Sequence, residues 1–472
     1  MINKILIANR GEIAVRIIRA CKEMEIKSVA VYSEVDHDAL YVKIASESYC
    51  LGSQTVACYL NVHRLVNIAI ASGCDAIHPG YGFLSENSLF AKVCEQRNIK
   101  FIGPTSAVIA KLGDKIQARK TMIAAGVPVT PGSDNNLANV EEAILLAQKI
   151  GYPVMLKATS GGGGRGIREC YHEKDLRHNY PRVISEASKA FGSAEVFLEK
   201  CIVNPKHIEV QILADELGNV IHLYERDCSI QRRHQKLIEI APSPQLSKEQ
   251  QEFIGNTAVK AAKAAGYTNA GTVEFLLDEQ DNFYFMEVNT RLQVEHTITE
   301  QITGIDIVQQ QINIANGEPL RYKQEDIVKR GYALEFRINA EDPQNDFLPS
   351  YGRITRYYAP GGPGVRTDAA IYTGYEIPPF FDSMCAKLIV WALDWNDVIR
   401  RSKRALSDMR VYGVKTTIPY YESILKNEDF ISGHFDTSFV EEHPELINYS
   451  AKNSNQHLAL AMAAAIAAHK GM

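Results

Sequence analysis

Residues 271–296 read GTVEFLLDEQDNFYFMEVNTRLQVEH. The runs VEFLL and FYFMEVN flank a DEQDN turn and predict a β-hairpin. In a hairpin folded about that turn, Glu274 lies opposite Glu287, within reach across the two strands. Beyond Glu287, a polar residue recurs at every second position, so an extended chain would place these side chains on one face. The residues of this predicted face are Glu287, Asn289, Arg291, Gln293 and Glu295.

This pattern predicts a cation site at the hairpin. The carboxylates of Glu274 and Glu287 and the amide oxygen of Asn289 would repel one another unless a cation joined them. Oxygen ligands favour a hard ion such as Mg²⁺, which is usually bound together with substrate phosphates. The alternative is a solvated polar face on an edge strand, and the apolar residues Val288, Leu292 and Val294 between the polar ones argue against it.

Composition limits the class of protein. The chain has 472 residues, of which 46% are hydrophobic and 23% charged, as expected for a soluble globular protein of about three domains. A net charge of −5 gives no basis for binding nucleic acid or an anionic membrane. Nine cysteines without a CxxC pair favour a reducing compartment over disulfides or zinc. The apolar run 458–468 is too short to span a bilayer, and we expect a cytoplasmic protein without a membrane segment.

Strand and helix signals alternate over residues 1–113 and predict an open, mostly parallel α/β sheet. The first predicted helix has an apolar stripe that would be buried, and a charged face. The charged face is either solvated or a contact with another subunit. The stripe consists of Ile13, Ile17, Cys21 and Met24, and the charged face of Glu12, Arg16, Arg19 and Glu23.

A second α/β unit starts near residue 114, and within it residues 153–170 read as strand, glycine loop, strand. A strand after the loop argues against a dinucleotide fold, and the chain has no P-loop motif. A glycine hairpin can bring backbone N–H groups close to phosphate and can close over a nucleotide. Lys115 and Lys157 carry charges suited to phosphate oxygens.

Three further polar patterns stand out. In KHIEVQIL, the polar residues His207, Glu209 and Gln211 alternate with apolar ones and predict a polar strand face. The segment ERDCSIQRRHQK, 225–236, is either a surface charge run or an anion site. Arg337 lies among apolar neighbours in a third region, about 330–447. The tail that follows is predicted to be a loosely attached helix or disordered.

The motifs NRGEIA, HPGYGFLSEN, KATSGGGGRG, ERDCSIQRRHQK, EVNTRLQVEH and RINAEDP occur in this order. Together they closely resemble biotin carboxylase, an ATP-grasp family, over about residues 1–447. The resemblance implies an α/β, ATP-grasp fold with four parts. These are a Rossmann-like N-terminal domain (1–113), an ATP-grasp domain (114–329) with a lid at about 130–200, a C-terminal domain (330–447) and a tail (448–472).

The resemblance also implies the site residues. ATP would be bound by Lys115, Lys157, Gly163, Gly164, Glu199, Lys200, Ile202, His207, Gln231, His234, Glu274 and Glu287. Two Mg²⁺ (or Mn²⁺) ions would be held by Glu274, Glu287 and Asn289. Bicarbonate would be held by Lys236, Arg291, Gln293, Val294 and Glu295, and biotin by Arg337 and Tyr81. The catalytic residues would be Glu295 as the base, with Arg291, Arg337 and Lys236.

The implied reaction has two stages. A carboxylate takes the proton of bicarbonate, which attacks the γ-phosphoryl group of ATP while metal ions neutralise the developing charge. The resulting carboxyphosphate hydrolyses readily, so a closing lid is expected. It yields CO₂ and phosphate, and the phosphate takes the N1′ proton of biotin while Arg337 stabilises the enolate.

Two residues depart from the family pattern. Thr297 replaces the proline of the usual EHPVTE segment, which would loosen the backbone beside the base. Pro363 replaces a common aromatic at a surface that packs subunits in relatives. Arg19 and Glu23 match the dimer face of the family and favour a homodimer, and Pro363 tempers that expectation.

The chain has no AMKM biotin-attachment motif and no carboxyltransferase region, so biotin would be carried by another polypeptide. The expected partners are a biotin carboxyl carrier protein and a carboxyltransferase subunit. GVKTTIPY and EEHPELINY resemble the biotin carboxylase subunit of two-subunit pyruvate carboxylases, and a role in acetyl-CoA carboxylase stays open. Two other hypotheses are an ATP-grasp ligase of the carbamoyl phosphate synthetase type and a catalytically silent structural subunit.

Overall fold

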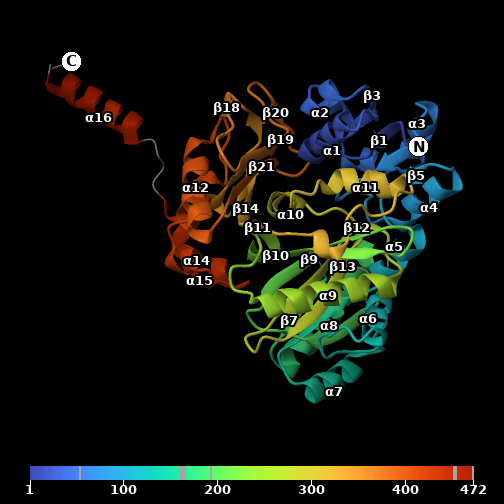
Figure 1. Cartoon of the computed structure of the whole chain (residues 1–472). Coiled ribbons are helices and arrows are strands. Elements are labelled where there is room, and N and C mark those ends of the chain that lie inside the picture. The colour runs from blue at the N-terminus through green and yellow to red at the C-terminus, as the bar shows by residue number, and fades with distance from the viewer. Residues whose placement is uncertain (53–54, 160–165, 192–193, 450–453, 470–472) are drawn as a thin grey trace.

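In a computed structural model of the chain, the structure is described for residues 1–52, 55–159, 166–191, 194–449 and 454–469 (Figure 1). The N-terminal part lies at the upper right of Figure 1, and the C-terminal part lies at the left. The large central sheet runs between them, and a smaller unit lies below it.

The N-terminal part contains a five-stranded sheet, and all its strand pairs are parallel. Ile5, Leu6 and Ile7 are fully buried, which fits a strand covered by helices on both faces. The parallel α/β sheet predicted here is confirmed. In sheet order the strands are β3 (Glu47–Cys50), β2 (Lys27–Tyr32), β1 (Lys4–Ile7), β4 (Ala76–His78) and β5 (Lys100–Phe101). Its helices are α1 (Gly11–Glu23), α2 (Leu40–Ile44), α3 (Val62–Ala71) and α4 (Ser88–Gln96).

Helix α1 buries more than its apolar stripe. Ile13, Ile17 and Cys21 are buried as predicted, and Met24 is partly buried. The prediction of a solvated charged face is wrong for Glu12 and Arg16, which are 3% and 6% exposed. They are buried because cationic and anionic partners from distant segments meet them: Arg16 pairs with Glu300 at 2.8 Å and Glu12 with Lys387 at 3.5 Å. Arg19 and Glu23 are exposed.

The central sheet has eight antiparallel strands and continues across the predicted boundary at residue 330. Strand β11 pairs with β14, so a strand from the predicted C-terminal domain extends the ATP-grasp sheet. Side chains from both regions therefore reach one face of one sheet. In sheet order the strands are β13 (Phe283–Asn289), β12 (Asn269–Leu277), β9 (Lys206–Ala214), β10 (Val220–Arg232), β11 (Gln235–Ala241), β14 (Tyr332–Asn339), β21 (Met384–Ala392) and β19 (Val365–Ala369).

The predicted hairpin is confirmed by the pairing of β12 with β13. Glu274 is registered with Glu287, as predicted. The prediction of one extended face up to Glu295 is wrong, because β13 ends at Asn289 and residues 290–295 form a loop. The chain leaves the sheet there to begin helix α10 (His296–Thr303).

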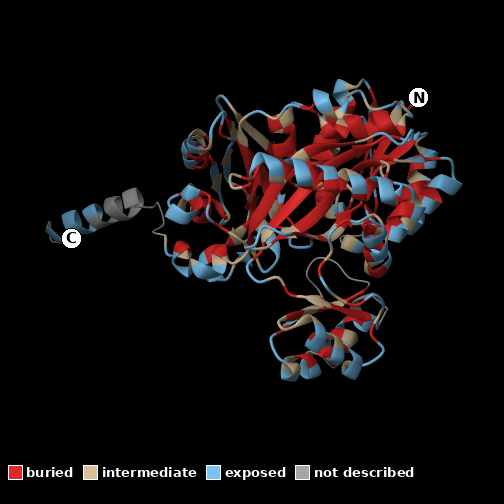
Figure 2. Ribbon diagram, turned by 60° about the horizontal axis from the view of Figure 1, so that its bottom comes forward, coloured by how far each residue is buried: buried red, intermediate tan, exposed pale blue. Residues whose placement is uncertain are grey.

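The predicted lid range contains a small unit with its own core. Strand β6 (Val154–Ala158) pairs with β7 (Ile167–Cys170) and β8 (Val196–Lys200), both antiparallel, and α7 (Val140–Ile150) and α8 (Glu173–Phe191) pack on them. Its buried residues, such as Leu156 and Val183, form a separate hydrophobic cluster. Figure 2 shows this unit projecting from the body. Gly163 and Gly164 lie outside the described residues.

Further helices lie outside the N-terminal sheet and the lid, and some of them pack on the central sheet. Helix α9 packs on β9 and β10, α10 on β14, and α12 on β21. They are α5 (Ser106–Gly113), α6 (Lys115–Ala124), α9 (Lys248–Ala265), α10, α11 (Ile307–Ala315), α12 (Trp395–Asp408), α13 (Ile418–Ile424), α14 (Glu428–Ser432), α15 (Phe439–Glu442) and α16 (Ser454–His469). Within the described ranges, no helix has the length and apolar character needed to cross a membrane.

Candidate active site

Lys236 lies at the centre of a buried group of charges on the central sheet. Its ammonium donates to Glu209 and Glu295, both at 2.6 Å, and to Glu274 at 3.2 Å. Burial alone would lower the pKa of Lys236, but the surrounding acidic groups outweigh it and raise the pKa well above its usual value. The lysine is therefore held as a cation.

Glu295 is fully buried between two cations. One carboxylate oxygen accepts from Lys236, and the other accepts from Arg337 at 3.0 Å. Burial and the nearby Glu209 would raise the pKa of Glu295, but Lys236, Arg337 and Arg226 outweigh them and lower it. The carboxylate is therefore ionised, as a group that is to accept a proton must be.

Arg337 extends from β14 into the same group because its strand pairs with β11. Its Nε donates to Glu239 at 2.5 Å, and the second oxygen of Glu239 has no hydrogen-bond partner among the described residues. Burial raises the pKa of Glu239 to about 8. On the neighbouring strand, Glu335 is registered with Glu239.

The predicted metal ligands lie at one end of this group. Glu274 accepts from Asn289 at 2.8 Å and from Gln293 at 3.0 Å, and its other oxygen lies 3.0 Å from His207 Nε2. Glu287 has no hydrogen bond or ion pair with a described residue. Burial and the nearby Glu274 raise the pKa of Glu287. An unpartnered carboxylate beside a second one fits a divalent cation.

The loop 290–295 brings its polar side chains together without being a strand. Arg291 donates to Glu86 at 2.8 Å, Asn289 at 3.0 Å and Gln293 at 2.7 Å. The contact with Glu86 spans 205 residues of sequence and fixes the loop against the N-terminal part. The residues predicted for bicarbonate thus converge, by side-chain contacts rather than by strand alternation.

Residues of β21 and β14 hold Val294 and the start of α10 in place. The fully buried Lys387 donates to the Val294 carbonyl at 2.7 Å. Thr297 is buried in the first turn of α10 and donates its hydroxyl to Glu335. This hydroxyl ties the first turn of α10 to β14, a contact that a proline at position 297 could not make.

The lid and α6 carry the other residues predicted for ATP. Lys157 on β6 pairs with Glu199 on β8, and Glu199 also accepts from Thr130 at 3.1 Å. Lys200 donates to two backbone carbonyls, and Ile202 is partly buried after β8. Lys115 is the first residue of α6, and burial lowers its pKa.

The outer residues of the predicted site differ in exposure. Gln231 is buried near the end of β10, whereas His234 is exposed in the turn before β11. The surface alternative for 225–236 is thus wrong for its first half, since Glu225, Arg226 and Asp227 are buried. The Tyr81 hydroxyl is buried without a hydrogen-bond partner among the described residues, and the Lys387 ammonium lies 5.9 Å from its ring centre.

Several groups that complete the site were not among the predicted residues. Glu209 bonds Arg226 at 2.5 Å and Lys236, and it lies on the polar strand face that the alternation indicated. Glu239 interrupts an apolar strand, the same signal that identified Arg337. Glu86 lies in the HPGYGFLSEN motif, but no local pattern links it to Arg291. Lys387 carried no signal beyond its apolar neighbours.

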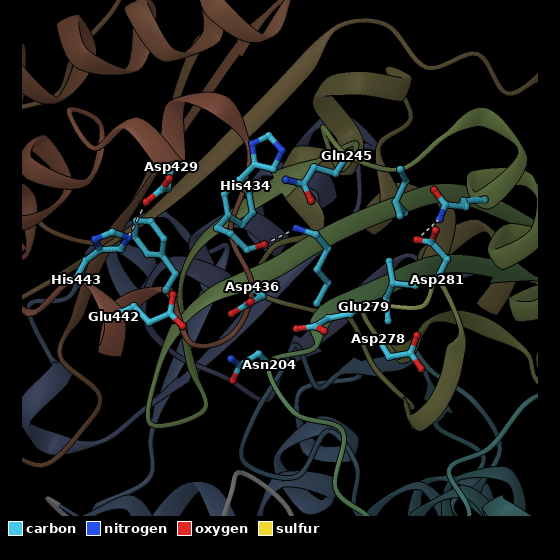
Figure 3. Close-up of a pocket in the computed structure, with 16 residues that line it drawn as sticks. Asn204, Gln245, Asp278, Glu279, Asp281, Asp429, His434, Asp436, Glu442 and His443 are labelled. Atoms are coloured by element: carbon cyan, nitrogen blue, oxygen red, sulfur yellow. Dashed lines mark hydrogen bonds and ion pairs between the residues drawn. The ribbon is translucent and has the colours of Figure 1, made fainter.

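A separate cavity of about 520 Å³ lies between the β12–β13 turn and the C-terminal helices α14 and α15. Its labelled residues include Asp278, Glu279 and Asp281 from the turn and Asp436, Glu442 and His443 from the C-terminal part (Figure 3). None of the predicted site residues lines it. The buried charge group, not this cavity, is therefore the candidate active site.

The chain is similar to known proteins over its whole length. It is 54% identical to the 2-oxoglutarate carboxylase small subunit of Hydrogenobacter thermophilus over 472 residues, which is 100% of both proteins. It is also 54% identical to Biotin carboxylase 1 of Bacillus subtilis, over 94% of this chain and 99% of that protein. The chain belongs to the biotin carboxylase family. Family models agree: the biotin carboxylase N-terminal domain matches 1–109 and the biotin carboxylase C-terminal domain matches 335–442.

The family assignment separates the alternatives. The model that matches 114–323 is described as the ATP-binding domain of the carbamoyl-phosphate synthase large chain, so that part alone does not distinguish the two enzymes. The biotin carboxylase N-terminal and C-terminal domains on either side of it distinguish this chain from carbamoyl phosphate synthetase. The predicted α/β ATP-grasp fold and the predicted enzyme class, an ADP-forming biotin carboxylase ligase that uses ATP, Mg²⁺, bicarbonate and biotin, are confirmed.

Solved biotin carboxylase structures share the fold. The biotin carboxylase domain dimer of H. thermophilus 2-oxoglutarate carboxylase, in complex with MgADP, ADP and bicarbonate, has a TM-score of 0.94 at 56% identity, over 96% of this chain and 100% of that one. The Campylobacter jejuni biotin carboxylase, in a β-γ-ATP complex, has a TM-score of 0.92 at 50% identity, over 94% and 99%.

Proposed function

We propose that Glu295 is the base of this biotin carboxylase and that Lys236 and Arg337 control its strength. The supporting observation is that each carboxylate oxygen of Glu295 is bonded to one of these cations. In this state they lower its pKa, and the carboxylate is a weak base. A bicarbonate ion that shares the two donors weakens their hold on Glu295 and raises its affinity for a proton.

Bicarbonate lies, in this proposal, between Lys236, Arg291 and the loop 290–295. Arg291 presents a fork of donors that suits a planar anion. Glu295 takes the bicarbonate proton, and the oxygen so activated attacks the γ-phosphoryl group of ATP. The products of this step are ADP and carboxyphosphate.

Glu274 and Glu287, with Asn289, would hold the magnesium ions. When bound, these ions neutralise charge on the transferring phosphoryl group. Lys115, Lys157 and His207 would contact phosphates or ribose, with Gln231 and His234 nearby, and Glu199, Lys200 and Ile202 would contact the adenine. Closure of the lid, including Gly163 and Gly164, would exclude water from carboxyphosphate.

Arg337 would meet the ureido oxygen of biotin, with Tyr81 beside it. Carboxyphosphate yields CO₂ and phosphate, the phosphate takes the N1′ proton, and the biotin nitrogen attacks CO₂. The guanidinium stabilises the negative charge on the ureido oxygen. Its ion pair with Glu295 links the proton-accepting step with the biotin step.

For the final acceptor we propose a 2-oxo acid, reached through biotin on a separate carrier protein and a carboxyltransferase subunit. One support is 54% identity, over 94% of this chain, to a pyruvate carboxylase subunit of Methanothermobacter thermautotrophicus. The other is the full-length similarity to the 2-oxoglutarate carboxylase small subunit. A homodimer is proposed because Arg19 and Glu23 match the family's dimer face and are exposed. A cytoplasmic location is proposed from the nine free cysteines.

The test is ATP cleavage by the purified chain with Mg²⁺ and bicarbonate, with and without free biotin. Bicarbonate-dependent ADP release that biotin stimulates supports the proposal. Stimulation by ammonia without an effect of biotin indicates a carbamoyl phosphate synthetase type of ligase, and no turnover indicates a silent subunit. Either result would refute the proposal.

The acceptor needs a second assay, with the biotin-bearing and carboxyltransferase subunits of the same organism added. Fixation of labelled bicarbonate into pyruvate or 2-oxoglutarate supports a 2-oxo acid. Fixation into acetyl-CoA alone would refute that part while leaving the role of Glu295 intact.

A further inference from the structure

Glu239 on β11 and Glu335 on β14 are two buried carboxyl groups at opposed positions of neighbouring strands. The two residues are registered with each other, and both are 0% exposed. Directly opposed residues have their Cβ atoms about 4.5–5.5 Å apart on one face of a sheet. Within the described residues, Glu239 Oε2 and Glu335 Oε1 are buried without a hydrogen-bond partner. Each group therefore leaves one oxygen free to meet the other group.

The second oxygen of each group is already bonded. Glu239 Oε1 accepts from Arg337 Nε at 2.5 Å, and Glu335 Oε2 accepts from the Thr297 hydroxyl. Lys387 lies near Glu335, but its ammonium donates to a backbone carbonyl, and Glu335 has no ion pair with a described residue. If both carboxyl groups were ionised, they would repel each other with a single cation in direct contact. One proton between the two free oxygens removes this repulsion.

The surrounding groups leave the pair with a proton at neutral pH. Burial raises the pKa of Glu239 to about 8 and the pKa of Glu335 to about 7. At a pH of about 7.5, between these two values, the pair holds one proton. The titratable and charged groups that face the pair come from six elements and are Lys236 (β11), Arg337 (β14), Lys387 (β21), Cys228 (β10), Glu295 (the loop 290–295) and Tyr421 (α13).

The guanidinium of Arg337 lies between this pair and Glu295. Its Nη2 is 2.5 Å from Glu239 and 3.0 Å from Glu295. No hydrogen bond joins its third nitrogen, Nη1, to a described residue. The side chain of Arg337 is 19% exposed, so a ligand can reach it, whereas the two carboxyl groups are out of reach. Glu239 thus fixes the orientation of the guanidinium without being open to a ligand itself.

We propose that Glu239 and Glu335 share one proton and that this pair positions Arg337, with Nη1 free to meet the ureido oxygen of biotin. The inference rests on the proposed function, because it requires the contact between Arg337 and biotin. With one proton, the pair holds the guanidinium by a single negative charge. When the proton is lost at higher pH, two negative charges compete with the ureido oxygen for the guanidinium. Both glutamates are positioning residues, since neither touches biotin.

Infrared spectroscopy of the full chain counts the shared proton, because the C=O stretch of a carboxylic acid is separate from the bands of a carboxylate. At a pH of about 7.5, Glu239→Gln and Glu335→Gln should each remove the same band, and the double variant should remove no more. A glutamine amide can donate the hydrogen bond that the proton made, so the two side chains stay joined. The matched control is Glu225→Gln, at a glutamate on β10 that is 1% exposed, and it should leave this band in place.

The KM for free biotin, measured between about pH 6.5 and 9, tests the positioning. In the unaltered chain it should rise by about tenfold as the pH passes through about 8. Glu335→Gln should flatten this rise, because its amide keeps the hydrogen in place. Glu239→Gln should have a KM about tenfold higher at low pH, because Arg337 loses a charged acceptor. Bicarbonate-dependent ATP cleavage should change less than the KM, and Glu225→Gln should follow the unaltered chain.

Loss of no band, or loss of a second band in the double variant, would overturn the shared proton. The same rise of KM with pH in Glu335→Gln as in the unaltered chain would overturn the positioning. Equal loss of ATP cleavage and biotin carboxylation in Glu239→Gln would show a structural role alone and would also overturn it. If Glu239→Gln does not fold, Glu335→Gln decides both points. Failure of the proposed function would appear differently, as absence of biotin-stimulated ATP cleavage in the unaltered chain.

Discussion

Arg337 and Glu295 form an ion pair at 3.0 Å, which joins the residue proposed to meet biotin to the residue proposed to take the bicarbonate proton. Each lies in a different predicted region of the chain, and 42 residues separate them. The pair means that a change at Arg337 also alters the base. The two effects can be separated by measuring the two half-steps independently.

Replacement of Arg337 by alanine should lower carboxylation of biotin far more than it lowers ATP cleavage that depends on bicarbonate alone. The lost guanidinium stabilises charge on biotin, and removal of one such donor costs about 10²–10³ in rate. Lys236 still holds Glu295 at 2.6 Å, so the first step keeps its base. Equal loss of both activities would refute the assigned role.

Replacement of Glu287 by glutamine should raise the Mg²⁺ concentration needed for half-maximal ATP cleavage by about tenfold or more. Burial and Glu274 already raise the pKa of Glu287, so this carboxylate gains more than an exposed one from a cation. Glu279→Gln in the turn of the same hairpin is the matched control. A similar Mg²⁺ requirement in all three proteins would contradict the metal assignment.

Lys387→Met should lower the free energy of unfolding by about 3–5 kcal/mol, because it leaves buried carboxylates without their cation. Glu12 lies 3.5 Å away, and the Val294 carbonyl loses its donor. The KM for bicarbonate should rise as the loop 290–295 relaxes. Urea unfolding and steady-state kinetics measure the two effects, with the exposed Lys403→Met as control. Adding Glu12→Gln should restore part of the stability but not the KM.

Thr297→Val should lower the free energy of unfolding by about 1–2 kcal/mol, since a buried carboxylate oxygen of Glu335 loses its donor. Thr297→Ser keeps the hydroxyl and should stay close to the unaltered protein. Thr297→Pro, the usual family residue, should still fold, because proline is tolerated in the first helical turn. Equal stability of the valine and serine variants would show that the hydroxyl contributes nothing.

Glu335 should make stability depend on pH. Burial raises its pKa to about 7 from 4.5, so near pH 6 the folded protein keeps a proton that the unfolded chain releases. The contribution of Glu335 to the free energy of unfolding is therefore full below pH 4.5 and is lost as the pH rises through about 7. The total loss is on the order of 3 kcal/mol. Glu335→Gln should remove this dependence. If the free energy of unfolding changed with pH in the same way in the unaltered protein and in Glu335→Gln, Glu335 would not be the source of the pH dependence.

Local patterns predicted the elements that depend on nearby residues. Two strand-forming runs around a polar turn were enough for the β12–β13 hairpin and for the register of Glu274 with Glu287. They could not show that β13 ends at Asn289, because polar alternation looks the same in a strand and in a loop. What shapes that loop is the contact of Arg291 with Glu86, far away in the chain.

The same limit explains the error on α1. A helix face with Glu12 and Arg16 has the composition of a solvent-exposed face. It is buried only because oppositely charged residues from other segments pair with it. Those partners, Lys387 and Glu300, lie hundreds of residues later. The family motifs supplied most site residues, whereas Lys387 became visible as part of the site only when the strands were placed side by side.

The continuous eight-stranded sheet and the lid, which has its own core, should tolerate different substitutions during evolution. Strands on both sides of residue 330 share a hydrogen-bonded ladder, so a substitution at a facing position of β11 must suit its neighbour on β14. The buried residues of the lid contact one another, so substitutions in its core need not be matched by substitutions in the other parts of the protein. Chimeras between distant relatives should therefore accept an exchanged lid and reject a junction placed between β11 and β14.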